Sequence, residues 1–385
     1  MTFRSKALII FSFLVFFSCF ASEEKPFWVR VLLSECSGQE NKKWTIRSES
    51  GFIIADPSGE SEKIHTNQKK LTVSVHGSFF YVDGKRFLKK EWVLFPKKGL
   101  LEWNGNFYKG SFLFVLQEHK KAFFINKLDL QDYIFAVLRS ESWPGWPLEI
   151  NKVFAVITRS YLISKVQEAK RQKRPYHIKN TKIHQSYNGH TFEKRNDKIL
   201  RLAVKQTKGL FLAYENKPIV AMFDSCCGGI IPSKVAGVDF QKAPYLAREY
   251  PCEHCKRCRL YNWSVSYDID QWTKLLKKAL PELKKVRGIM VTKRDDAGLM
   301  QKVLVQGKKK SFVLTGKQLY SLLDTVKSFY FTVHKNKKNI VLKGRGYGHH
   351  LGLCQWGARE MVRDKWGYKK IIQFYYPNVS FVRLA

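Results

Sequence analysis

Acidic residues are scarce in this 385-residue sequence: 68 Lys and Arg outnumber 32 Asp and Glu, which gives a formal net charge of +36. A charge of this size attracts polyanions. Zinc-finger spacing and RNA-binding signatures are absent and the basic residues are spread along the chain, so nucleic acid is not the predicted partner. An exported polyanion or an acidic glycan is the better candidate, although solvated surface lysine explains the same composition.

Repeats of fixed period and Pro-rich or Gly/Ser-rich linkers are also missing, which excludes a solenoid. The N-terminal segment MTFRSKALIIFSFLVFFSCFAS has Arg4 and Lys6 before an apolar run and small residues near Ala21. This order predicts a secretory signal peptide over residues 1–21 and a secreted, periplasmic or cell-envelope protein. Lipidation at Cys19 is the alternative, but two phenylalanines just upstream disfavour it. No transmembrane segment is predicted after the signal.

The rest of the chain predicts an α+β fold. Short β-type runs broken by polar turns fill residues 22–126, and Asp83-Gly84 is a hairpin signal. Residues 127–385 alternate helical and strand patterns, and residues 260–285 are expected to be helical. We expect two β-rich parts packed around a central helix at about 148–165.

That central helix is apolar on two sides. One stripe comprises Ile150, Val153, Phe154, Ile157 and Tyr161, and a second comprises Ala155, Val156, Leu162 and Ile163. A helix of this kind is buried. Arg159 sits among these apolar neighbours and needs a partner, because an unpaired buried ion is very costly. A nearby carboxylate is the expected partner.

Glu141 precedes this helix in the segment ESWPGWP. Its two prolines fix φ and make the turn stiff, and its two tryptophans surround the acid with rings. One interpretation is a charge stabilised by a helix N-terminus. The other is a general acid, because a carboxyl group beside indole rings loses the hydration of its charged form and becomes a better proton donor near neutrality.

Glycine and cysteine mark two further places. In the segment GRGYGHHLGLCQWGA the glycines at 344, 346, 348 and 352 let the backbone fold tightly around His349 and Gln355, and a helix is expected from about Gln355 to Lys365. Five cysteines lie between 226 and 258, which favours a metal site or a local disulfide knot. Cys252, Cys255 and Cys258 form overlapping Cys-x-x-Cys units that suit tetrahedral zinc, with Cys226 or Cys227 as fourth ligand, while a disulfide stays open.

Several separated motifs together resemble the SpoIID/LytB family, the stage II sporulation protein D type of peptidoglycan lytic transglycosylase. They are LDLQDYIFAVLRSESWPGWPLE, AVITRSY, QSYNG, AVKQTKGLFLAYENKPIVAMFDSCCGG, APYL and GYGHHLGLCQWGA. The resemblance covers most of the chain after the signal. It departs from the family at Phe154, His350 and Cys354, where the family usually has Gln, Gly and Ser.

The resemblance implies a set of site residues. The catalytic group is Glu141, Arg159, His349 and Gln355. The residues expected to contact glycan are Trp143, Trp146, Tyr187 and Trp356. Many members pair a cysteine in the CGG position with a later Cys-x-x-Cys, which implies a structural zinc on Cys227, Cys252, Cys255 and Cys258.

The resemblance also implies an activity, cleavage between N-acetylmuramic acid and N-acetylglucosamine on strands stripped of peptides. One carboxyl suffices, because the sugar's own 6-hydroxyl can close a 1,6-anhydro ring while Glu141 first donates and then accepts a proton. A hydrolase would need a second acid about 5 to 9 Å away. Glu149 and Asp224 are the candidates, and Glu149 is better explained as a helix-start charge. The alternative function is a noncatalytic wall-binding protein that enhances a partner amidase.

Overall fold

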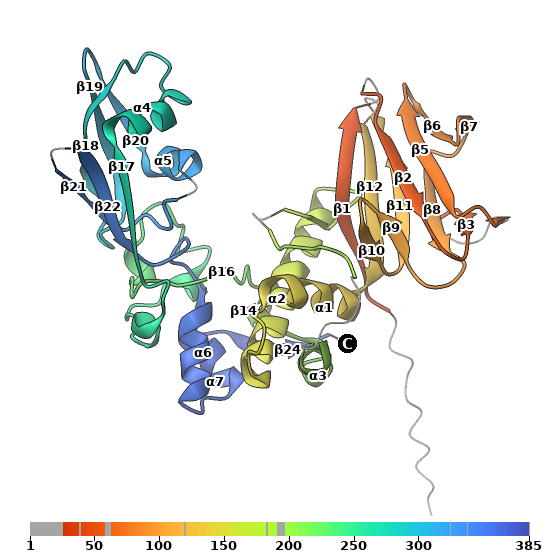
Figure 1. Cartoon of the computed structure of the whole chain (residues 1–385). Helices are drawn as coiled ribbons and strands as arrows, with labels where there is room; N and C mark the ends of the chain where they lie inside the picture. Colours follow the sequence, from red (N-terminus) through yellow and green to blue (C-terminus); the bar gives the residue numbers. More distant parts are fainter. Residues whose placement is uncertain are drawn as a thin grey trace, which may run out of the picture.

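Two antiparallel sheets packed face to face form the N-terminal unit of the computed structural model (Figure 1). The first contains β1 (Trp28–Ser37), β3 (Phe52–Ala55), β4 (Ile64–Thr66), β8 (Glu91–Pro96), β11 (Ser111–Leu116), β12 (Lys121–Asp129) and the short parallel β13 (Ile178–Lys179). The second contains β2 (Lys43–Arg47), β5 (Lys70–His76), β6 (Phe79–Val82), β7 (Lys85–Phe87), β9 (Leu101–Trp103) and β10 (Asn106–Tyr108).

Apolar side chains, many of them aromatic, fill the space between these two sheets. Trp92 and Phe114 stack with centroids 4.2 Å apart, and Trp44 packs on Phe114. The hairpin predicted at Asp83-Gly84 is confirmed: both residues have positive φ and join β6 to β7.

The structure describes residues 26–37, 40–57, 63–118, 121–181, 184–190, 197–323, 325–336 and 338–384. The predicted signal peptide, residues 1–21, lies outside them. None of the helices in these ranges is both long and apolar enough to cross a bilayer.

Helices occupy the centre of the molecule (Figure 1). They are α1 (Leu130–Glu141), α2 (Leu148–Arg171), α3 (Asp197–Gln206), α6 (Gln355–Arg363) and α7 (Tyr368–Tyr375). The central buried helix is confirmed as α2, in which 14 of 24 residues are buried. The Asp129 side chain caps α1 by accepting the Gln131 N–H.

Short strands bind distant segments to these helices. β14 (Leu210–Tyr214) pairs with β15 (Lys217–Pro218) and β24 (Ser380–Arg383). β16 (Phe223–Asp224) runs parallel to β23 (Leu353–Cys354). Single 3-10 turns are η2 (Pro232–Lys234), η3 (Pro244–Leu246) and η4 (His254–Arg257).

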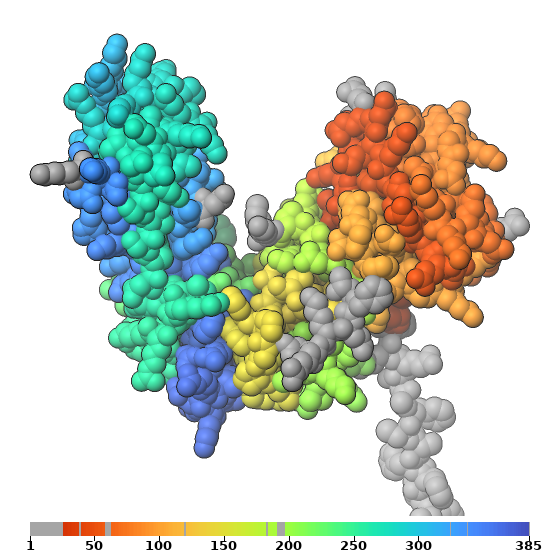
Figure 2. Space-filling model, in the orientation of Figure 1, coloured from red at the N-terminus to blue at the C-terminus, as the bar shows by residue number. Residues whose placement is uncertain are grey.

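Residues 262–345 form a lobe with a core of its own, around Trp272, Leu276 and Phe331. Its elements are β17 (Asn262–Asp268), α4 (Ile269–Lys277), β18 (Val286–Arg294), β19 (Met300–Gly307), β20 (Ser311–Thr315), α5 (Gly316–Leu322), β21 (Phe331–Lys335) and β22 (Asn339–Arg345). Figure 2 shows a broad hollow between this lobe and the N-terminal unit. The α+β fold class is therefore confirmed, with a distinct lobe inside the predicted 127–385 part.

Candidate active site

Glu141 is the last residue of α1, and the turn to α2 follows it at once. The interpretation of Glu141 as a charge stabilised by a helix N-terminus is therefore wrong. Glu141 lies at the C-terminal end of α1, and α2 begins only at Leu148. Exposed carbonyls at a helix C-terminus disfavour a negative charge.

Glu141 lines a pocket of about 470 Å³. The pocket is lined by Arg139, Ser140, Glu141, Ser142, Trp143, Pro144, Gly145, Trp146, Asn151, Asp197, Ile199, Leu200, Ser225 and Gln355. The backbone N–H of Ser186 donates to Glu141 Oε1 at 2.9 Å. One carboxyl oxygen is thus held in place within the pocket.

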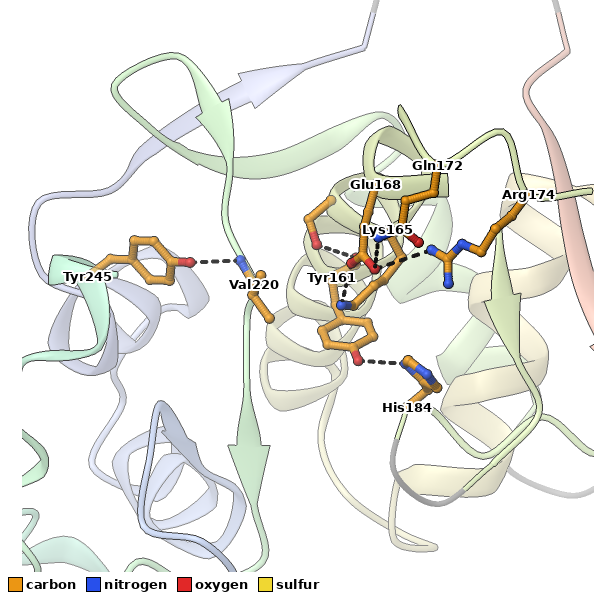
Figure 3. A network of polar contacts seen from close by, with 9 residues as sticks. Tyr161, Lys165, Glu168, Gln172, Arg174, His184, Val220 and Tyr245 are labelled. Atoms are coloured by element: carbon orange, nitrogen blue, oxygen red, sulfur yellow. Dashed lines mark hydrogen bonds and ion pairs between the residues drawn. The ribbon is translucent and has the colours of Figure 1, made fainter. Parts of the chain in front are cut away.

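The segment that carries Ser186 is anchored on both sides. The Tyr161 hydroxyl of α2 bonds to His184 Nδ1 at 2.9 Å (Figure 3). Beside it, Glu168 of the same helix pairs with Lys165 and with Arg174, which lies just beyond the helix. Gln185 is buried and accepts from the Tyr133 hydroxyl at 2.8 Å. The donor to Glu141 therefore has little freedom to move.

Tryptophan rings build one wall of the site. Trp143 and Trp146 lie nearly parallel with centroids 6.4 Å apart, and Trp356 meets their rings edge-on at 5.7 and 5.5 Å. The Arg259 guanidinium lies 5.4 Å from the Trp143 ring. Three of the four predicted glycan-contacting aromatics therefore form one cluster beside the acid.

Asn151 fixes the turn and was not predicted. Its Nδ2 donates to the carbonyls of Trp146 and Pro147 at 2.9 and 3.0 Å, and its Oδ1 accepts from the Ser142 hydroxyl at 2.6 Å. A signal existed in the sequence: Asn151 lies in a helix that is predicted to be apolar on two sides, and a polar side chain buried there must be hydrogen-bonded.

A buried ion pair, also unpredicted, closes the other side of the pocket. Arg139 Nε lies 3.1 Å from Asp197 Oδ1, and both side chains are almost fully enclosed. Asp197 and Glu141 are the carboxylates among the described lining residues, and Asp197 is already paired. Nothing near Arg139 in the sequence indicated a partner at the start of α3.

Gln355 also lines this pocket and is only 4% exposed. It begins α6, where the Trp356 N–H donates to the Ser225 carbonyl at 3.1 Å. His349 lies elsewhere and lines a separate pocket between residues 233–240 and the 262–345 lobe. Burial lowers the pKa of His349, and a hydrogen bond to the Phe223 backbone partly opposes this shift.

Arg159 and Tyr187 do not line the pocket either. Among the described residues Arg159 donates to the Leu210 carbonyl at 2.8 Å and to Gln131 Oε1 at 3.3 Å, so the expectation of a carboxylate partner is wrong. A carbonyl and an amide accept from its two terminal nitrogens instead, Nε has no hydrogen-bond partner among the described residues, and burial lowers the pKa of the guanidinium to about 9. Tyr187 is 1% exposed and donates to Asn126 Oδ1 at 2.5 Å.

The two candidates for a second acid are engaged outside the pocket. Glu149 lies in the first turn of α2, binds Lys152 and accepts the Tyr368 N–H at 2.9 Å. Asp224 accepts the His350 N–H at 2.8 Å, and burial raises its pKa well above the ordinary value. Gly348, at φ +138°, allows that approach, because a Cβ there would overlap Asp224. No partner acid for a bound water thus lines the pocket among the described residues.

Four buried cysteines could bind a metal directly behind the pocket. The Sγ atoms of Cys227, Cys252, Cys255 and Cys354 all lie within 4.8 Å of one another, and Cys227 and Cys255 are 3.7 Å apart. Tetrahedral zinc with Zn–S bonds of about 2.3 Å needs sulfurs about 3.8 Å apart, so the donor set and spacing fit.

The prediction of Cys258 as a member of this four-thiol set is wrong, because Cys354 takes its place. The parallel pairing of β16 with β23 brings Cys354 against Cys227, whose N–H donates to Cys354 Sγ at 3.2 Å. The Tyr375 hydroxyl lies 3.2 Å from Cys252 Sγ. Cys354 stood in the sequence only as a departure from the family pattern, 127 residues from Cys227.

Comparison with known proteins agrees with this architecture. The family model SpoIID, described as Stage II sporulation protein, matches residues 118–214, and a domain of unknown function, DUF8618, matches 245–352. Residues 118–214 of this chain thus form a SpoIID domain, as the sequence motifs predicted. Stage II sporulation protein D and the amidase enhancer are its distant homologues.

The relatives differ in how much they share. An uncharacterized protein of Brachyspira hyodysenteriae is 29% identical over 86% of this chain and 84% of its own length. Stage II sporulation protein D of Bacillus amyloliquefaciens is 24% identical over 66% of this chain and 75% of its own. The amidase enhancer of Bacillus subtilis is 23% identical over 63% of this chain and 39% of its own.

Proposed function

We propose that this protein is an exported peptidoglycan lytic transglycosylase that cuts the bond between N-acetylmuramic acid and N-acetylglucosamine. The observation that carries the proposal is Glu141, a helix-terminal carboxyl group held by the Ser186 N–H in a tryptophan-walled pocket. Sugar rings stack on aromatic faces, so the half-buried Trp143 ring, which packs on the buried Trp146, provides a surface for the strand. The net charge of +36 favours a wall polymer that carries carboxylates.

In this mechanism one carboxyl performs both proton transfers. Protonated Glu141 donates to the glycosidic oxygen as the bond to the anomeric carbon breaks. The 6-hydroxyl of the same muramic acid residue then attacks that carbon, and Glu141 accepts its proton. The absence of a second free carboxylate among the described lining residues favours ring closure over hydrolysis.

Zinc on Cys227, Cys252, Cys255 and Cys354 would be structural, because four protein ligands leave no open position for water. Two pocket residues are close in sequence to these ligands: Ser225 lies two positions before Cys227, and Gln355 directly follows Cys354. When bound, zinc would crosslink the segments that carry those walls.

The experiment compares purified protein on intact and on amidase-treated sacculi, with products analysed by mass. We expect chains ending in 1,6-anhydro-muramic acid, with more product from the peptide-stripped strands. Glu141→Gln keeps the shape but removes the transferable proton and should abolish cleavage while preserving binding. Glu149→Gln, in the neighbouring helix turn, is the matched control and should remain active.

A second function is supported by the relative named amidase enhancer. In that case the protein would bind the wall and stimulate a partner amidase without cutting glycan. Equal stimulation of an amidase by the parent chain and Glu141→Gln, with no anhydro product from either, would favour this function over the transglycosylase.

A further inference from the structure

Two more cysteines adjoin the four-thiol set. Cys226 is 0% exposed and Cys258 is 7% exposed, so both thiols are buried. The Cys226 thiol lies against the thiols of Cys255, Cys258 and Cys354. The four-thiol set therefore extends on one side into a group of six sulfurs.

Cys255 and Cys354 occupy the middle of this group. The Cys255 thiol contacts Cys226 on one side and Cys227 and Cys252 on the other. The Cys354 thiol contacts the same three partners. Cys255 and Cys354 are thus the two thiols that contact both Cys226 and the pair Cys227 and Cys252.

We propose that the six cysteines hold two zinc-class divalent ions, with Cys255 and Cys354 bridging them. The inner ion takes Cys227 and Cys252 as terminal ligands, and the outer ion takes Cys226 and Cys258. Each ion then has four sulfur ligands, which is the number that structural zinc requires. Loading releases six thiol protons, one from each cysteine.

The backbone explains how adjacent residues serve different ions. Successive side chains of an extended segment point to opposite sides, so Cys226 and Cys227 diverge. Cys226 is held by a backbone pair with Tyr347, while Cys255 lies in η4, Cys258 caps the C-terminal end of η4 and Cys252 lies just before it. Cys255 contacts Cys226 as well as Cys227 and Cys252, so it reaches both positions.

Net charge does not oppose the second ion. One divalent ion with four thiolates carries a net charge of −2, and two ions with six thiolates carry the same −2. The outer ion therefore accommodates two more buried thiolates without adding charge to the interior. Backbone N–H groups already point at these sulfurs, from Leu260 to Cys258 at 3.2 Å and from Gly357 to Cys354 at 3.3 Å.

This inference goes beyond the proposed function and does not depend on glycan cleavage. It concerns the chain's metal content, and the outer ion would lie between Cys258 and Cys226, the residue that directly follows the pocket residue Ser225. Arg259, next to Cys258, contacts Trp143, so the outer ion also braces the aromatic wall.

The test is metal analysis of the full chain purified with reductant and without oxygen. Native mass and elemental analysis should give two zinc ions per chain. Cys258→Ser and Cys226→Ser should each retain one. Cys36→Ser is the matched control, because Cys36 is a buried cysteine in β1 outside the group, and it should retain two.

Cobalt titration of the metal-free parent chain tests the bridge without any variant. Thiolate-to-cobalt absorption should rise up to two equivalents, and the electron paramagnetic resonance signal should weaken at the second as the ions couple. One zinc per parent chain, with Cys226 and Cys258 as free thiols or as a disulfide, would overturn the second ion and leave the four-thiol site. Zero metal, or iron with acid-labile sulfide, would overturn both.

Discussion

Replacing Asn151 by alanine should loosen the turn that positions Glu141. The side chain makes three hydrogen bonds at 1% exposure. Each contributes about 0.5 to 1.5 kcal/mol net, so their loss costs about 3 kcal/mol. Alanine returns roughly 0.5 kcal/mol through its higher helix propensity in the first turns of α2. The expected net loss of unfolding free energy is about 2 to 3 kcal/mol.

Activity should fall further than stability alone explains. A shift of about 1 Å at a reacting group can slow a reaction about a hundredfold, and Asn151 is what joins Ser142 to the Trp146 and Pro147 carbonyls. Urea unfolding followed by tryptophan fluorescence would measure stability, and release of anhydro-muramic ends from denuded strands would measure activity at a temperature where the variant stays folded.

Asn188→Ala is the matched control, because Asn188 is exposed and makes one 3.3 Å bond to Ser140. It should change the unfolding free energy by less than about 0.5 kcal/mol. The reasoning is refuted if Asn151→Ala unfolds at the parent's urea midpoint, or if it is destabilised yet cuts strands at the parent's rate.

Three further predictions concern other parts of the chain. Arg159→Ala should lower stability as much as activity, because it frees the buried Leu210 carbonyl and Gln131; a fully stable but inactive variant, seen by thermal melting beside the strand assay, would contradict this. Gly357→Ala should reduce zinc content and melting temperature, because the new Cβ would lie 2.7 Å from Cys252 Sγ; unchanged zinc by elemental analysis would contradict it. Burial, then the charge of Arg30, lowers the pKa of His177 from 6.5 to about 3. The folded state therefore binds fewer protons than the unfolded state between these values, and stability should fall by about 1.4 kcal/mol per pH unit as pH drops from 6.5 toward 3. His177→Asn should flatten that slope in urea titrations, whereas exposed His65→Gln should not.

Local patterns predicted the features that local chemistry determines. The two-sided apolar helix, the hairpin at Asp83-Gly84 and the proximity of Glu141 to its tryptophans depend on residues close in sequence, and all three are present. Residues 260–285 were expected to be helical, yet 262–268 form β17, because pairing along β22 outweighs local propensity there.

Features that depend on distant contacts could not be predicted. Cys354 enters the metal set through the pairing of β16 with β23, and Asp197 reaches Arg139 through the packing of α3 on α1. Arg159 meets a strand carbonyl where a carboxylate was expected. In each case the residue type indicated that a partner was needed, but the identity of that partner depended on the tertiary fold.

The parallel pairing of β16 with β23 has a consequence for the order in which the molecule is completed. Ser225 directly follows β16 and Gln355 directly follows β23, and both line the same pocket. The pocket is therefore formed by two segments that are far apart in the sequence. In a chain that is still being made, Glu141 and its tryptophans are present long before Gln355. The proposed glycan site is therefore completed only once β23 has been made and has paired with β16.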